Sequence, residues 1–107
     1  MDEKRREPRI KVDWQTEVHL NDRTIEGMVK NITSKGMLIC CEEPLSMKVN
    51  YPISILVPDQ KAINVIGRPI WYDYYTIDEE DAVCIGLVFV EISTEDRDSL
   101  KEILHGP

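Results

Sequence analysis

Apolar and polar residues alternate along most of this chain. Between positions 10 and 20, for example, Ile10, Val12 and Trp14 alternate with Lys11 and Asp13. A period of two places successive side chains on opposite faces, which is typical of half-buried β-strands. Other segments are shorter and more continuously apolar, as expected for strands buried on both faces. The pattern predicts six strands, over residues 10–20, 24–29, 37–41, 53–57, 62–72 and 83–92.

Turn-forming residues separate these segments. Residues 31–36, with the sequence NITSKG, and the acidic run at 78–81 predict loops, the second a solvated hairpin tip. Gly36 is expected to supply a backbone conformation with positive φ. Pro69 cannot donate to a sheet ladder, so the strand over 62–72 should be bent, bulged or at an edge there. Gly86, inside the most apolar strand, predicts a bulge or a close backbone approach.

The end of the chain carries the only helical pattern. Ser93 followed by Asp96 resembles a capping box, and Leu100, Ile103 and Leu104 form an apolar stripe at helical spacing. A helix over 94–105 is therefore predicted. Six closely spaced strands followed by one helix indicate an all-β fold, a six-stranded antiparallel β-barrel with a short C-terminal α-helix. The expected organisation is a flexible basic arm over 1–9 and a single domain over 10–107.

Composition narrows the function. The 107 residues suit one domain, and the net charge of −7 argues against sequence-blind binding of DNA or RNA. No apolar run approaches the roughly 18 residues that span a bilayer, and no secretory signal is visible, so we expect no membrane insertion. Three cysteines, two of them adjacent, make a poor disulfide framework. They predict buried thiols in a reducing cytoplasm. His19 and His105 have no metal-ligand spacing, so no metal site is expected.

Charge is distributed unevenly. Residues 4–11 hold five basic residues and one acidic residue, a local charge of +4, so the other 99 residues sum to −11. Arg5, Arg6 and Arg9 lie in this segment, in an R-x-x-x-R pattern stiffened by Pro8. The planar guanidinium fork pairs with phosphate oxygens and with the Hoogsteen edge of guanine. The segment is therefore a candidate site for a small anionic guanine nucleotide.

The loop at 31–36 complements this arm. Asn31 offers an acceptor for guanine N–H groups, Thr33 and Ser34 offer hydroxyls, and Gly36 leaves room for a ligand near the backbone. Taken singly, each motif has an ordinary interpretation, a solvated tail in one case and a β-turn in the other. Their joint occurrence favours a ligand-binding role. Neither segment pairs a nucleophile with a base, so the expected activity is binding rather than catalysis.

Both motifs resemble those of the PilZ domain family. The R-x-x-x-R of Arg5 and Arg9, with Arg6 as the doubled arginine, precedes Asn31, Thr33 and Gly36 in the [D/N]-x-S-x-x-G position. Residues 66–72, 84–90 and the final helix resemble the family more weakly, so the similarity covers essentially the whole chain. Thr33 stands where Ser is commoner, and Pro69 replaces an apolar residue.

The resemblance implies a receptor for the bacterial second messenger cyclic di-GMP. It implies that the arginine arm wraps the ligand while the second motif contacts its other side. The expected function is a non-catalytic, cytoplasmic receptor module without a cofactor, whose arm orders over the nucleotide and changes the surface shown to a protein partner. Lys35 and Trp71 are weaker candidate contacts. The alternative is an adaptor of the same fold that works without nucleotide in pilus or flagellar control. The partner, the regulated process (motility, biofilm formation or another) and the number of nucleotides bound stay open.

Overall fold

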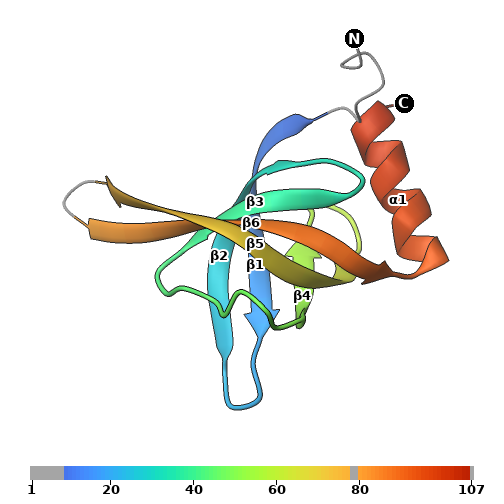
Figure 1. Ribbon diagram of the computed structural model, residues 1–107. Coiled ribbons are helices and arrows are strands. Elements are labelled where there is room, and N and C mark those ends of the chain that lie inside the picture. The colour runs from blue at the N-terminus through green and yellow to red at the C-terminus, as the bar shows by residue number, and fades with distance from the viewer. Residues whose placement is uncertain (1–8, 78–79, 107) are drawn as a thin grey trace, which may run out of the picture.

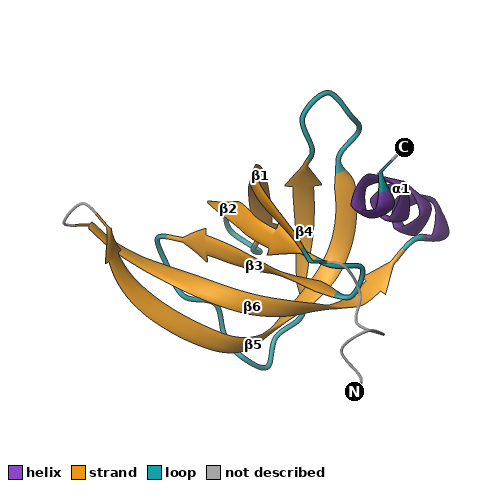
Figure 2. Cartoon of the chain, turned by 90° about the horizontal axis from the view of Figure 1, so that it is seen from above, coloured by secondary structure: helices purple, strands orange, loops and turns teal. Residues whose placement is uncertain are grey.

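Six strands close into one barrel. The structure is a computed structural model that describes residues 9–77 and 80–106. The elements are β1 (Ile10–His19), β2 (Thr24–Ile32), β3 (Gly36–Cys41), β4 (Tyr51–Leu56), β5 (Ile63–Ile77), β6 (Glu80–Ile92) and α1 (Thr94–His105). Neighbouring strands are all antiparallel, in the closed order β1-β2-β3-β6-β5-β4 (Figures 1 and 2). The predicted fold class is confirmed.

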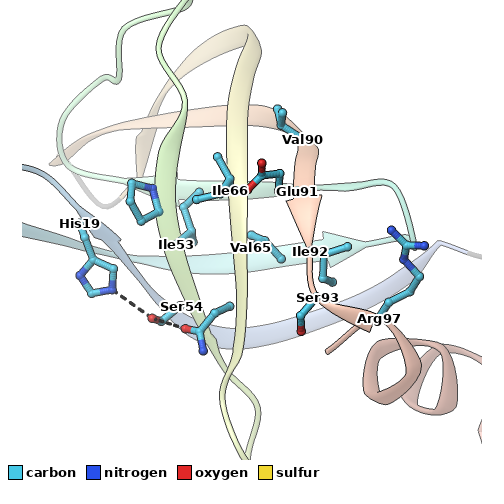
Figure 3. A pocket seen from close by; sticks show the side chains of 12 residues that line it. His19, Ile53, Ser54, Val65, Ile66, Val90, Glu91, Ile92, Ser93 and Arg97 are labelled. Carbon is cyan, nitrogen blue, oxygen red and sulfur yellow. Dashed lines mark hydrogen bonds between the residues drawn. The ribbon is translucent and has the colours of Figure 1, made fainter. Parts of the chain in front are cut away.

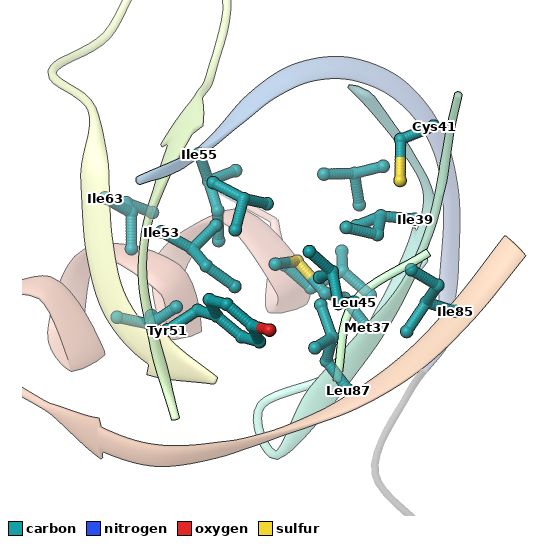
Figure 4. Close-up of a cluster of buried hydrophobic side chains, with 14 of the residues drawn as sticks. Met37, Ile39, Cys41, Leu45, Tyr51, Ile53, Ile55, Ile63, Ile85 and Leu87 are labelled. Atoms are coloured by element: carbon teal, nitrogen blue, oxygen red, sulfur yellow. The ribbon is translucent and has the colours of Figure 1, made fainter. Parts of the chain in front are cut away.

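The barrel interior is filled by aliphatic side chains. Ile39, Ile55 and Ile85 come from three different strands and are fully buried (Figure 4). Burial of such a side chain is worth about 1.5–3 kcal/mol, so this interior is the main stabilising element of the domain. Thr16 is the buried polar member of the described core, and its hydroxyl donates to the carbonyl of Ser54 at 2.8 Å. That bond satisfies a group that would otherwise be costly to bury.

The terminal helix α1 lies against one end of the barrel (Figures 1 and 2). Leu100 and Leu104 are buried and join the core cluster, as the apolar stripe predicts. Ser93 caps the helix, because its hydroxyl accepts from the amide of Asp96 at 3.0 Å. The predicted capping box is only half formed. The Asp96 carboxylate accepts instead from the backbone amide of Asn64 at 3.1 Å, so it ties the helix to β5.

Strand β5 is longer than the sequence pattern indicates. We predicted its end at residue 72, but it continues to Ile77, and the β5–β6 ribbon extends beyond the other strands (Figures 1 and 2). Asp73 and Tyr74 at the start of this extension are both exposed, so neither contributes a buried position to a strand pattern. The irregularity expected around Pro69 is present, since the pairing with β6 shifts between Pro69 and Trp71 and again between Ile66 and Gly67. The acidic tip falls partly outside the described residues, with β6 beginning at Glu80.

The cysteines depart from the sequence prediction. Cys40 and Cys84 form a disulfide between β3 and β6, where they are direct register partners with Cα atoms 4.0 Å apart. Only Cys41 is a free buried thiol, and burial raises its pKa above the usual value. The prediction of three buried thiols is therefore wrong for two of them. The sequence argument for a reducing compartment also loses this support.

Candidate functional site

Four strands place one residue each in a row across the outside of the barrel. Asn31 on β2 is paired with Leu38 on β3, which is paired with Gly86 on β6, which is paired with Trp71 on β5. Directly paired residues of antiparallel strands project from the same face. The row faces outward, because most of the chain neighbours of its residues are buried in the core, namely Ile32, Met37, Ile39, Ile85 and Leu87. We call these four residues the outer row.

Trp71 and Gly86 fit each other closely within the outer row. A Cβ built on Gly86 would lie 2.7 Å from Cε2 and 2.8 Å from Cδ1 of the Trp71 indole, with Nε1 nearer still. The indole therefore lies flat over the glycine, while 44% of its surface stays exposed. The sequence predicted a bulge or a close backbone approach at Gly86; the structure shows a register shift in the facing strand, between Pro69 and Trp71, and the close approach of a side chain. Trp71 thus presents a fixed aromatic face, of the kind on which nucleic-acid bases stack.

The turn that connects β2 to β3 borders the outer row. The Thr33 hydroxyl accepts from the amides of Lys35 and Gly36, at 3.0 and 3.2 Å. The Thr33 amide donates to the Gly36 carbonyl at 2.9 Å, which closes the turn. The same hydroxyl also donates to the Gly36 carbonyl at 3.4 Å, so all of its hydrogen bonds lie within the turn. Thr33 therefore stabilises the turn through its own hydrogen bonds. The sequence had suggested only a ligand contact for this residue.

Glycine is required at position 36 for a different structural reason from the one predicted. Its φ is not positive, since Gly106 is the only described glycine in that region of conformation. A Cβ on Gly36 would collide with the backbone carbonyl of Leu87 on β6. The missing side chain thus makes room for the neighbouring strand, and the expectation that it also leaves room for a ligand stays a prediction. Close approach is also visible in the bond from the Phe89 amide to the Lys35 carbonyl, at 2.9 Å.

The arginine motif leads directly to this turn. Ile10 pairs with Ile32, so Arg9 and Thr33 come next at the same end of the β1–β2 ladder. Arg9 is exposed, whereas Arg5 and Arg6 lie outside the described residues. The two motifs are thus neighbours in space at their described ends, although 23 positions separate Arg9 from Ile32.

Further basic residues surround the outer row. Lys11 pairs with Asn31, Lys35 lies in the turn, and Arg68 pairs with Val88, itself the partner of Gly36. All three are exposed. Among the described residues, no carboxylate forms an ion pair with them. Lys11 and Arg68 were not predicted as site residues, because only strand register reveals their proximity. Together these cations give an otherwise acidic domain a local site for an anion.

Ser34 and Asn31 complete the predicted set. Both are half-buried, Ser34 within the turn and Asn31 at the end of β2. The described part of the predicted site is therefore one continuous area, made of the turn at 33–36, the outer row and Arg9. Its chemistry combines an aromatic and aliphatic platform, one amide side chain, and basic groups at the edge. Such a surface can stack a base and pair with phosphates.

A groove lies elsewhere on the barrel surface, away from the outer row. A groove of about 590 Å³ runs over the outside of β4, β5 and β6 to the start of α1, lined by residues that include His19, Ser54, Asn64, Val90 and Arg97 (Figure 3). Ser54 donates to the Asn64 side-chain oxygen at 2.8 Å, and its oxygen lies 3.0 Å from His19 Nε2. His19, Ser54 and Asn64 thus form a hydrogen-bonded chain of side chains along one wall of the groove.

Metal binding and membrane spanning require particular arrangements of residues. Within residues 9–77 and 80–106, no three His, Cys, Asp or Glu side chains gather as a metal ion would require. No helix in this part of the chain is long and apolar enough to cross a membrane.

Known proteins share the fold described above. The family model for the PilZ domain matches residues 3–106, nearly the whole chain. No curated protein sequence matches significantly. Solved structures match over most of the chain at low identity.

Three of these structures illustrate the likeness. The PilZ domain with c-di-GMP of YcgR from Escherichia coli gives a TM-score of 0.79 at 15% identity, with 96% of this chain and 90% of that chain covered. The inhibitor of motility MotI/DgrA from Bacillus subtilis gives 0.77 at 16% identity, covering 96% and 50%. The MrkH–c-di-GMP complex from K. pneumonia gives 0.81 at 18% identity, covering 94% and 51%. This chain thus spans about half the length of MotI and MrkH.

Proposed function

Because the chain belongs to the PilZ domain family, we propose that it is a non-catalytic receptor for cyclic di-GMP. The YcgR and MrkH structures similar to it are complexes with that nucleotide. The proposed contacts are Arg5, Arg6 and Arg9 of the arm, with Asn31 and the turn at 33–36 on the barrel. Trp71 adds a stacking face and Lys35 a weaker contact. The arm comprises residues 1–9 and the receptor domain residues 10–107.

One observation carries the proposal. The β1–β2 ladder ends with Ile10 opposite Ile32, which brings Arg9 beside the Thr33 turn. A ligand that contacts the turn is therefore within reach of the arginine fork. Cyclic di-GMP has two phosphodiester charges and two guanine rings, and arginine recognises both kinds of group bidentately.

The outer row supplies the other half of the interaction. A guanine that stacks on the exposed Trp71 indole gains about 1–3 kcal/mol, and Leu38 continues the apolar surface toward Asn31. The Asn31 amide then has donor and acceptor groups for a guanine edge. Lys11, Lys35 and Arg68 lower the cost of bringing a dianion to a domain of net charge −7.

Ordering of the arm is the proposed signal. Binding recruits the arginines onto the barrel and so changes the surface beside β1 and the β2–β3 turn, to which a protein partner responds. We place this receptor in the cytoplasm.

Calorimetric titration of the full chain with cyclic di-GMP tests the proposal. We expect saturable binding, and we expect Arg9→Ala to weaken it by about tenfold or more, since a charge-assisted hydrogen bond contributes about 1.5–3 kcal/mol. Arg97→Ala, an exposed arginine on α1, is the matched control and should bind as the wild type does. An absence of binding at about 100 µM nucleotide would refute the receptor function and favour a nucleotide-independent adaptor.

A further inference from the structure

The disulfide lies on the same outer face as the proposed nucleotide site. Cys40 is two residues from Leu38 on β3, and Cys84 is two residues from Gly86 on β6. We propose that Cys40 and Cys84 are a reversible thiol–disulfide site, exchanged by small thiols and disulfides, and that the closed bond favours nucleotide binding. The second half of this inference rests on the proposed receptor function.

Strand register makes the pairing specific. Cys40 is directly opposite Cys84, whereas the adjacent Cys41 is opposite Val83. Cys41 points into the core, is 5% exposed, and its thiol donates to the carbonyl of Glu43 at 3.2 Å. Neighbouring residues of a strand project to opposite faces, so Cys41 cannot replace Cys40 in the bond. Two of the three cysteines are therefore positioned for this chemistry and the third is kept out of it.

Backbone pairing holds the two sulfurs together with or without the bond. Six consecutive residue pairs join β3 and β6, from Gly36 and Val88 to Cys41 and Val83. The reduced cysteines therefore stay opposite each other and can close again without refolding. In a reducing compartment, disulfides are usually transient and often redox-sensing.

Exposure decides which sulfur is attacked. Cys40 is half-buried, whereas Cys84 is only 4% exposed. An external thiolate attacks the Cys40 sulfur, forms a mixed disulfide there, and releases the Cys84 sulfur as a thiolate that takes up a proton. A second external thiol then attacks the external sulfur of the mixed disulfide. The Cys40 sulfur is released and takes up a proton, and the two external thiols leave as one oxidised disulfide. Two electrons pass from the external thiols to the protein, and closure by a small disulfide is the reverse.

The bond is coupled to the site through its neighbours in the sheet. Two non-bonded sulfurs require more separation than bonded ones, so reduction must spread the two cysteines or turn their side chains. The next pair on the same face of these two strands is Leu38 and Gly86, and Gly86 lies under the Trp71 indole with no spare room. A shift there changes the tilt of the platform on which the base stacks. We therefore expect weaker nucleotide binding in the reduced protein.

Thiol counting tests the site itself. The full chain is equilibrated with mixtures of reduced and oxidised glutathione, alkylated under denaturing conditions and weighed by mass spectrometry. One free thiol at the oxidising end and three at the reducing end, with peptide mapping to Cys40–Cys84, would support the proposal. Three thiols in every mixture, a bond involving Cys41, or a bond that resists excess dithiothreitol in the folded protein would overturn it.

Titration with cyclic di-GMP tests the coupling. The oxidised protein should bind at least about twofold more tightly than the reduced protein. Cys40→Ser and Cys84→Ser should both match the reduced wild type in either condition, and Cys41→Ala should keep the difference. Equal affinities of the two states, or a difference that persists in Cys40→Ser, would overturn the coupling. If neither state binds, the receptor function and the coupling both fail, while the thiol count still decides whether the pair is redox-active.

Discussion

Substitution of Gly86 by alanine tests how the Trp71 platform is built. The added Cβ would lie 2.7–2.8 Å from two carbons of the indole, so the ring must rise from the sheet. Overpacking of this kind costs about 1–3 kcal/mol. Because 44% of the indole is already exposed, the ring has a way outward and the lower half of that range applies. Alanine also stiffens the unfolded chain relative to glycine, which returns about 0.5–1 kcal/mol.

The expected net effect of Gly86→Ala is a loss of about 1 kcal/mol in the free energy of unfolding, measured by urea denaturation. The same substitution in a Trp71→Ala background meets no ring and should stabilise the protein by about 0.5–1 kcal/mol. The sign of the effect therefore reverses between the two backgrounds, which is a coupling that a double-mutant cycle measures. Equal costs in both backgrounds would refute the idea that Gly86 exists to seat the indole.

Three further predictions concern the turn and the cysteines. Thr33→Val removes the acceptor for two turn amides and should cost about 1–3 kcal/mol in urea unfolding, whereas Thr33→Ser should be nearly neutral; equal losses would contradict the role of the hydroxyl. Reduction of the Cys40–Cys84 bond, which spans 44 residues, should lower the free energy of unfolding by about 2–4 kcal/mol, with Cys40→Ser as the control that no longer responds. Burial raises the pKa of Cys41 above 9.0, so the folded protein keeps this proton at a pH where the unfolded chain loses it. Its contribution to stability should therefore fall as pH rises above about 9, and Cys41→Ala should lack that fall.

The sequence predicted the fold well because the strands alternate cleanly and the helix has its own period. Val18 and Ile25, for example, are buried residues whose chain neighbours on either side are polar. The pattern failed for the end of β5, since Asp73 and Tyr74 are both exposed where this strand runs past the barrel. Periodicity reports burial, and it cannot delimit a strand that has none.

The parts of the site that sequence reasoning missed depend on residues distant along the chain. Gly36 suggested a turn conformation, but the constraint comes from the Leu87 carbonyl, 51 positions away. Asp96 suggested a capping box, but its carboxylate accepts a hydrogen bond from the backbone amide of Asn64. Sequence rules for caps and turns consider only partners that are close along the chain. A partner from a distant segment can take the same hydrogen bond or the same space, and the nearby sequence does not indicate it.

The disulfide illustrates the same limit. Cysteine count and adjacency argued for free thiols, whereas the register of β3 and β6 sets Cys40 opposite Cys84. A shift of that register by one residue would place Cys41 opposite Cys84 and turn one of the two toward the core. The pairing is therefore a consequence of barrel closure, which composition does not encode.

The most direct test of the central claim is a map of where cyclic di-GMP contacts the barrel. Backbone amide spectra of ¹⁵N-labelled protein, recorded during titration, report each residue separately. The account predicts the largest shifts at residues 33–36, at Leu38 and Gly86, and at the Trp71 indole N–H, with Ser54 and Asn64 of the groove unchanged. Shifts centred on the groove, or none on the outer row, would contradict it.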